Sequence, residues 1–372
     1  MTPKRDAIVV GAGVIGLASA WRAAAQGLAV TVIDDASAGG ASRASAGMLA
    51  PSTEVEYGEE TLLRLNLAAA EAWPSFASEL EAAAGRDVGY RTCGTVAVAR
   101  DGDELAALID HYRYQRELGL EVERLSAREL RRLEPGLAPG VRGGLLVRDD
   151  HQVDSRALVE ALREACSRAG VSFRSARAVA LGDGPCVRLS DGDEPTARHV
   201  VLCAGCWTNA IEGLSAAAVP PVRPVKGQLL HLSGPASPPL AERNVRGLEV
   251  YIVPRADGRV VVGATVEEQG FDGRATAGGV FELLRDAYEI LPGITELELT
   301  EIAVGFRPGS PDNAPVIGPA GPDGVVVATG HYRNGILLTP VTADAVASLL
   351  VSGALPELVA PFTAARFAEV PT

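Results

Sequence analysis

Cysteine, histidine and long apolar runs are scarce in this sequence, and each scarcity excludes a class of protein. The chain has five cysteines in 372 residues. An odd number in so long a chain does not fit a disulfide framework, so we expect a reducing, cytoplasmic setting. The five histidines include no second ligand pair at metal spacing, which argues against a zinc site. No stretch is long and apolar enough to cross a membrane, so the sequence predicts a soluble chain.

Basic residues are also fewer than acidic ones, which gives a formal net charge of −13. Nucleic acid requires basic patches that meet its phosphates, so no such partner is expected. The basic start of the chain, followed by an apolar run, resembles a secretory signal. Cleavage there would remove the strand and turn described next, so we reject that interpretation.

A glycine-rich turn joins an apolar strand to a helix over residues 7–16 (AIVVGAGVIG). Gly11 allows the tight turn, Gly13 lets a pyrophosphate approach the backbone, and Gly16 lets the helix pack on the strand. The helix N-terminus offers N–H groups to phosphates. Asp34 closes the next apolar run, where its carboxylate can accept hydrogen bonds from ribose hydroxyls and would repel a 2′-phosphate. A structural turn is the alternative, but the pattern favours a dinucleotide site.

The pattern along the chain predicts an α/β fold, with a Rossmann-type domain and an inserted, mostly antiparallel β-sheet domain. Strands and helices alternate at first, and the pattern becomes mainly β-type from about residue 222. Locally, we expect a loop over 39–50, one extended run over 171–181 and a last helix over 335–350. We assign the discontinuous cofactor-binding domain to residues 1–85, 150–221 and 305–372, and the substrate-binding domain to 86–149 and 222–304.

Four further segments follow the turn in a characteristic order: 45–49 (SAGML), 251–255 (YIVPR), 305–308 (GFRP) and 330–337 (GHYRNGIL). Together they resemble the FAD-dependent D-amino acid oxidase family, and within it the glycine oxidase branch that serves thiamine thiazole synthesis in some bacteria. The resemblance spans nearly the whole chain. Its C-terminal segments are more specific than the glycine turn.

The resemblance implies a flavoenzyme that oxidises glycine, sarcosine or small D-amino acids with FAD. Because residues 308–317 contain no cysteine, we expect this FAD to be bound non-covalently. Hydride transfer to the flavin would give glyoxylate, ammonia and, with dioxygen, hydrogen peroxide. Thiazole synthase would be a partner for the imine product, and a homo-oligomer is compatible with the sequence. Two alternatives stay open: a dehydrogenase that uses a quinone or carrier, and a flavin-binding module without turnover.

The candidate substrate-binding residues are Arg307, Tyr251 and Arg333. Arginine offers a fork of donors that matches a carboxylate, although an arginine beside a turn is often only solvated. The resemblance implies that Arg307 and Tyr251 bind the substrate carboxylate and that Arg333 binds substrate or helps close the site. Glu249 departs from the family pattern, which has histidine there. On a strand it would share the face of Tyr251, so it is the one acid to exclude as a base.

The resemblance also implies the cofactor-binding residues. If Asn334 and Gly335 begin the last helix, its positive end faces the flavin and stabilises the reduced form. The set comprises Gly11, Gly13, Val14, Ile15, Gly16, Asp34, Asp35, Ala41, Ser42, Ala46, Gly47, Met48, Val179, His331, Tyr332, Arg333, Asn334, Gly335, Ile336 and Leu337.

Cys203 and Cys206 form a C-x-x-C motif at the end of a predicted strand. Such a motif can be a redox pair. We favour the alternative, in which small residues at a strand end pack beneath a cofactor.

Overall fold

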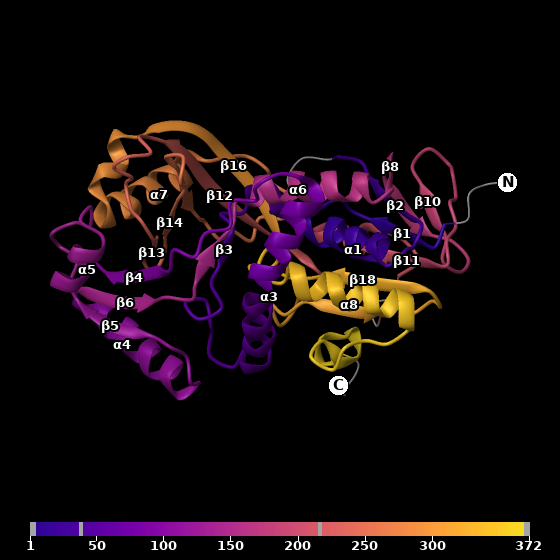
Figure 1. Cartoon of the computed structure of the whole chain (residues 1–372), viewed down its shortest axis with the longest axis horizontal. Helices are drawn as coiled ribbons and strands as arrows, with labels where there is room; N and C mark the ends of the chain where they lie inside the picture. Colours follow the sequence, from indigo (N-terminus) through magenta and orange to yellow (C-terminus); the bar gives the residue numbers. More distant parts are fainter. Residues whose placement is uncertain (1–4, 37–39, 215–217, 368–372) are drawn as a thin grey trace.

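Two large sheets lie side by side in the computed structural model (Figure 1). The structure describes residues 5–36, 40–214 and 218–367, so the extreme start of the chain and the first residue of the 39–50 segment lie outside it. The predicted α/β fold class is confirmed.

The first sheet is built around β1 (Ala7–Val10), all four residues of which are buried. A strand that is apolar on both faces indicates a parallel sheet covered on both sides. The strand order is β17 (Val316–Pro319), β18 (Val325–Thr329), β11 (His199–Leu202), β1, β2 (Val30–Asp34) and β8 (Ser172–Ser175). Strands β2 and β11, the neighbours of β1, are both parallel to it, whereas β17 runs antiparallel to β18.

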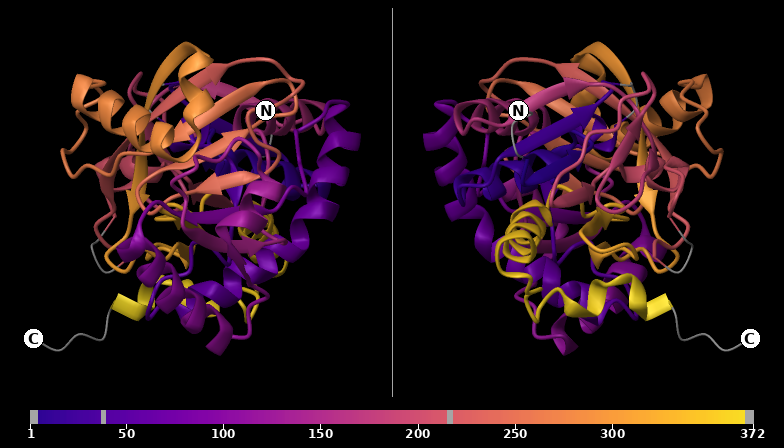
Figure 2. Two further views of the ribbon diagram at one scale, coloured as in Figure 1. Left: turned by 90° about the vertical axis from the view of Figure 1, so that its left-hand side faces the viewer. Right: turned by 90° about the vertical axis from the view of Figure 1, so that its right-hand side faces the viewer.

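Four helices cover one face of this sheet and share one apolar core with it. A hairpin covers the other face, where Leu181 and Val187 pack against Ile8. In the right-hand view of Figure 2, α8 is seen nearly along its axis. These elements are α1 (Val14–Ala25), α3 (Glu60–Ala84), α6 (Ser155–Arg168), α8 (Thr339–Ser352), β9 (Ala178–Leu181) and β10 (Val187–Leu189).

The second sheet is mostly antiparallel, with β13 and β4 as a parallel pair. Its order is β16 (Glu298–Gly309), β12 (Arg223–Ser233), β15 (Arg259–Gly263), β14 (Tyr251–Pro254), β13 (Asn244–Arg246), β4 (Thr95–Ala99), β6 (Gly143–Val147) and β5 (Glu123–Ser126). α7 (Ala277–Ile290) packs on one face, and α4 (Gly102–Glu117) and α5 (Ala127–Leu133) cover the β4–β6 end. β16 runs through the boundary predicted at residue 304, and the domain boundaries stay predictions.

Short elements complete the described chain. They are α2 (Ala41–Ala44), β3 (Met48–Leu49), β7 (His151–Gln152), η1 (Gly205–Ala210), η2 (Pro292–Glu296), η3 (Ala360–Phe362) and η4 (Ala364–Phe367).

A buried arginine joins the two sheets through the 40–49 segment. Arg255 follows β14 and is only 6% exposed. Its guanidinium donates to the carbonyls of Ala46 at 2.6 Å and Val153 at 3.0 Å, and to the side-chain oxygen of Gln152. Burial lowers the pKa of Arg255 to about 10, so it stays charged at neutral pH. One side chain therefore fixes the second sheet, the 40–49 segment and the chain before α6 relative to one another.

Three local predictions are wrong. The 39–50 loop contains α2 and β3, because alanine favours a helical turn and Met48 and Leu49 pair with β7. The extended run over 171–181 is two strands, since β8 joins the first sheet and β9 turns away to pair with β10. The last helix begins at Thr339, not Gly335, and Pro340 favours that start because its fixed φ suits a first turn.

Gly47 tests how tightly the 40–49 segment is held. Its φ is +73°, and a Cβ there would lie 1.9 Å from the Val153 carbonyl oxygen, whereas Gly58 has φ +83° with nothing within 4 Å. Alanine therefore strains the backbone at both positions but clashes only at Gly47. Gly58→Ala should lower the free energy of unfolding by about 1 kcal/mol, and Gly47→Ala by about 3 kcal/mol or more. Urea denaturation measures both, and equal losses would show that the segment can move aside.

Candidate functional site

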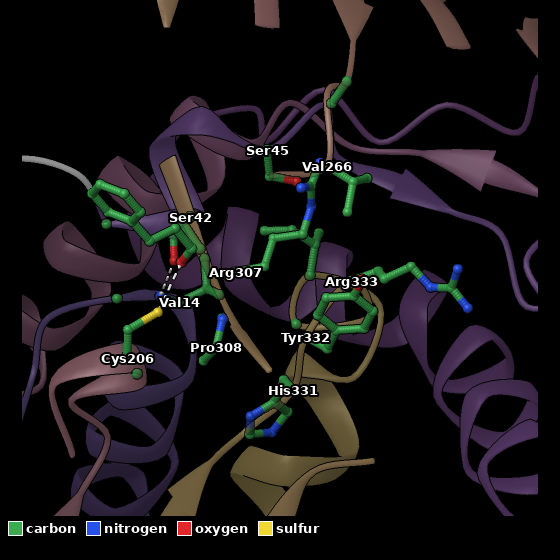
Figure 3. A pocket seen from close by; sticks show the side chains of 18 of the residues that line it. Val14, Ser42, Ser45, Cys206, Val266, Arg307, Pro308, His331, Tyr332 and Arg333 are labelled. Carbon is green, nitrogen blue, oxygen red and sulfur yellow. Dashed lines mark hydrogen bonds between the residues drawn. The ribbon is translucent and has the colours of Figure 1, made fainter. Parts of the chain in front are cut away.

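A cavity of about 1270 Å³ runs from the glycine turn to the second sheet. This volume exceeds the roughly 300–1,000 Å³ of most small-ligand sites, so the cavity can hold a dinucleotide and a small substrate together. Gly11 and Asp34 line it from the first sheet and the turn after β1, and Tyr251 and Arg307 line it from the second sheet. Figure 3 shows the cavity from close by, with Arg307 reaching toward Ser45 and Val266.

The structure brings most of the predicted residues to this cavity. Those lining it are Gly11, Gly13, Val14, Ile15, Asp34, Asp35, Ala41, Ser42, Ala46, Met48, Val179, Tyr251, Arg307, His331, Tyr332, Arg333, Gly335 and Ile336. Gly16, Gly47, Asn334 and Leu337 are not among its lining residues.

The glycines of the turn are needed for close backbone packing. Gly11 has φ +106°, and a Cβ there would lie 2.4 Å from the Cys203 carbonyl oxygen. A Cβ on Gly16 would lie 2.0 Å from the Gly11 carbonyl oxygen, so the helix could not approach the turn. At Gly13 a Cβ would meet only Ser42 Oγ, at 3.2 Å. Gly13 is therefore the position that leaves the cavity side of the turn open.

The polar groups around this turn fit the pyrophosphate and ribose of FAD. Gly13 is the N-cap of α1 without a side-chain cap, and a first helical turn leaves N–H groups available to an anion. Ser42 Oγ accepts the hydrogen bond of Val14 N at 3.1 Å. The Asp34 carboxylate accepts from the amides of Ala12 and Ala36, both at 2.8 Å. Each carboxylate oxygen keeps a further lone pair for a ribose hydroxyl.

The 331–337 segment is fastened to the strand that carries Arg307. The amide of Tyr332 donates to the Pro308 carbonyl at 2.9 Å, and its φ of +47° is strained for a residue with a side chain. His331 is 2% exposed, and its Nε2 lies 3.1 Å from the hydroxyl of Thr342. Burial lowers the pKa of His331 to about 3, so the ring is neutral. The predicted helix end at Asn334 is absent, because α8 begins at Thr339.

Arg307 and Tyr251 lie flat over two glycines of the second sheet. A Cβ on Gly227 would come within 2.7 Å of the Arg307 guanidinium, and one on Gly263 within 2.6 Å of the Tyr251 hydroxyl. Arg307 Nη1 donates to the Thr265 carbonyl at 3.1 Å, which leaves other donors for a ligand. Burial raises the pKa of Tyr251, and the charge of Arg307 only partly offsets it, so the phenol is a neutral donor.

Arg333 lines the cavity, whereas Glu249 does not lie on the strand of Tyr251 as predicted. Arg333 extends away from Arg307 (Figure 3), and its Nη1 lies 3.2 Å from a carboxylate oxygen of Glu56. Glu249 lines the cavity but is exposed and precedes β14, which begins at Tyr251. The alternation argument that placed Glu249 on the face of Tyr251 is therefore wrong, because it holds only within a strand.

Glu54 and Arg246 were missed by the sequence analysis. Both line the cavity, and Arg246 Nη1 lies 2.7 Å from Glu54 Oε1. Glu54 stands only six residues after Met48, so an acid closely following the 45–49 segment is the signal that could have been used.

Cys203 and Cys206 are both buried, and burial raises the pKa of each thiol to about 12. Cys206 Sγ donates to the Phe306 carbonyl at 3.2 Å. Because a redox pair acts through a thiolate, these contacts favour the packing interpretation.

No helix within the described ranges is both long and apolar enough to cross a membrane. Residues 5–36, 40–214 and 218–367 contain no cluster of three or more His, Cys, Asp or Glu side chains that could hold a metal ion.

Comparison with known proteins agrees with the fold and the cavity. A family model described as FAD dependent oxidoreductase matches residues 6–349. The glycine oxidase of Geobacillus kaustophilus is 33% identical over 377 residues, covering 98% of each chain. The crystal structure of glycine oxidase from Geobacillus kaustophilus matches with a TM-score of 0.88 and 32% identity, over 98% of this chain and 99% of that one.

The bifunctional protein ThiO/ThiG of Trichormus variabilis is 34% identical over 371 residues, which are 98% of this chain and 55% of that protein. The chain thus spans about half the length of the bifunctional relatives it matches. With a family match from strand β1 into α8, and a fold that agrees with it, the chain belongs to the FAD-dependent oxidoreductases.

Proposed function

We propose that this chain oxidises a small amino acid, glycine foremost, with FAD as the immediate oxidant and dioxygen as the final acceptor. The observation that carries this proposal is that Arg307 and Tyr251, on the second sheet, line the same cavity as the dinucleotide turn. A guanidinium beside a neutral phenol suits a carboxylate. The relatives named glycine oxidase support the choice of substrate.

Bound FAD would supply the two-electron chemistry, by which glycine, dioxygen and water become glyoxylate, ammonia and hydrogen peroxide. The protein's own residues bind and orient the substrate. Arg307 neutralises the carboxylate and Tyr251 donates a hydrogen bond to it, which fixes the direction of the α-C–H bond.

The proposed reaction uses no side chain as a base at the α-carbon. The guanidinium of Arg307 is a hydrogen-bond donor without an acceptor site, and Tyr251 stays neutral because burial raises its pKa. His331 is neutral, but its ring is buried and contacts Thr342. Glu249 is exposed and outside the strand. Once the ammonium group of the substrate has lost a proton to solvent, the lone pair of the neutral amine would assist the departure of hydride.

We further propose thiamine thiazole synthesis as the destination of the imine product, with thiazole synthase as the partner. The support is that the ThiO/ThiG relatives carry a further part beyond the segment matched here. The cytoplasmic setting and a homo-oligomeric state remain predictions.

Adding glycine to the FAD-loaded chain without oxygen tests the proposed function. The visible flavin absorbance should bleach, and α-deuterated glycine should bleach it more slowly. Readmitted dioxygen should restore the colour with stoichiometric hydrogen peroxide. A colour that glycine leaves unchanged would favour a binding module, and restoration by quinones but not by dioxygen would favour the dehydrogenase.

Arg307→Ala should lower kcat/KM for glycine by about two to three decades, because the substrate carboxylate loses its charge partner. Arg307→Lys should recover little, since an ammonium group cannot reproduce the fork. Arg274→Ala is the control, because this arginine is 85% exposed and pairs with Asp272. Steady-state kinetics measure all three, and a lysine variant with parental kinetics would exclude Arg307 as the carboxylate ligand.

FAD should be bound without a covalent link. Residues 308–317, which follow the motif around Arg307, contain no cysteine to which a flavin could be attached. Cys203 and Cys206 line the cavity, but burial raises the pKa of each to about 12, so neither is a ready thiolate. Acid precipitation should leave the yellow colour in the supernatant. Colour retained in the pellet would contradict this prediction.

A further inference from the structure

Glu54 faces the same cavity as Tyr251 and Arg307, yet the proposed function does not use it. Its side chain is 13% exposed, and its Oε1 accepts a hydrogen bond from Arg246 Nη1 at 2.7 Å. In the part of the chain that the structure describes, its second oxygen, Oε2, accepts no hydrogen bond. A carboxylate held through one oxygen keeps lone pairs for a ligand.

Pairing of the strands places this carboxylate near the substrate-binding tyrosine. Arg246 on β13 is the direct cross-strand partner of Tyr251 on β14, so their side chains are neighbours on one face of the sheet. The pKa of Tyr251 responds to the same arrangement. Burial raises it, the charge of Arg307 lowers it and the charge of Glu54 raises it. The phenol is therefore within reach of both a positive group and a negative group.

Buried hydrogen bonds hold the backbone just before Glu54 in place. Asp150 is fully buried, and its carboxylate accepts from the amides of Ser52 at 3.1 Å and Thr53 at 2.7 Å, and from the Thr53 hydroxyl. The side-chain amide of Gln115 donates to the Ser52 carbonyl at 2.8 Å. A turn held by this many buried contacts holds the following side chain in place, as a ligand site requires.

Of the described arginines that line the cavity, some have a carboxylate partner and one does not. Arg246 is paired with Glu54, and Arg333 lies 3.2 Å from Glu56. Within the described chain, Arg307 has no carboxylate partner. An anionic group of a ligand is therefore drawn to Arg307, and a cationic group to the free oxygen of Glu54.

We propose that Glu54 binds the amino group of the substrate through Oε2, and that Arg246 positions Glu54 for this contact. The inference rests on the proposed function and narrows it. The site selects an α-amino acid over a 2-hydroxy acid of the same shape, because only the amino acid brings a positive group to Glu54.

Two ligands of matched shape test the proposal on the FAD-loaded chain. 2-Aminoisobutyrate and 2-hydroxyisobutyrate both lack an α-hydrogen, so neither can be oxidised, and they differ only in the group that should meet Glu54. Binding is measured from the shift of the visible flavin spectrum. Glu54→Gln keeps the oxygen that faces Arg246 and removes the charge. It should weaken 2-aminoisobutyrate about tenfold or more and 2-hydroxyisobutyrate less than about twofold, as loss of one charge-assisted hydrogen bond implies.

Control variants separate recognition from folding. Glu71→Gln removes an exposed charge on α3 outside the cavity and should change neither affinity. Glu54→Asp keeps the charge but shortens the side chain, so it should also weaken the amino ligand selectively. Thermal melting confirms that each variant is folded. Should Glu54→Gln not fold, Glu54→Asp decides the question by the same comparison.

Equal losses for the two ligands, or no loss for either, would overturn the role of Glu54. So would a parent chain that binds neither ligand. Anaerobic reduction of the parent chain by glycine is scored separately. If glycine fails to reduce the flavin while Glu54→Gln still weakens the binding of 2-aminoisobutyrate selectively, the result would support amino-acid recognition by Glu54 and contradict the oxidation of glycine. If glycine reduces the flavin but Glu54→Gln binds both ligands normally, only the role of Glu54 falls.

Discussion

The geometry of the cavity depends on the buried guanidinium of Arg255. A charge so deeply enclosed is stable only if its donors are satisfied, and here the partners come from separate stretches of the chain. Ala46 belongs to the segment between the sheets, and Gln152 and Val153 precede α6. Because Tyr251 lies four residues earlier on the adjoining strand, the contacts of Arg255 also set the distance between the cofactor side and the substrate side.

Two glycines shape the part of the cavity around Arg307 and Tyr251, because they have no side chain. Arg307 and Tyr251 are large, and both lie over glycines, Gly227 and Gly263, where a methyl group would occupy their place. A flat arginine and a flat tyrosine leave the space above them open to a ligand. The glycines have no chemistry of their own, yet they decide whether the two functional groups face the cavity.

The features that the sequence could predict are those determined by local spacing. The dinucleotide turn and Asp34 lie within one strand–helix–strand unit, so residue types and intervals sufficed to recognise them. Arg307 and Tyr251 came from family resemblance, since a strand arginine and a strand tyrosine have ordinary structural explanations.

The Glu54–Arg246 pair and the Asp150 contacts join residues about one to two hundred positions apart. No local pattern reports such pairing. The start of α8 was misplaced for a related reason: Gly335 continues an apolar periodicity, but tight turns occupy residues 335–338 before Pro340 favours the helix.

The neutral ring of His331 makes the stability of a segment that lines the cavity depend on pH. Histidine in an unfolded chain titrates near pH 6.5, whereas burial lowers the pKa of His331 to about 3. Between about pH 3 and pH 6.5, this histidine is protonated in the unfolded chain but neutral in the folded chain. The contribution of His331 to stability is therefore complete above about pH 6.5 and is lost as the pH falls toward 3. Because this ring anchors the segment beside the strand of Arg307, protonation acts directly on a wall of the cavity. Acid therefore destabilises the 331–337 segment, residues of which line the cavity, through a single buried ring.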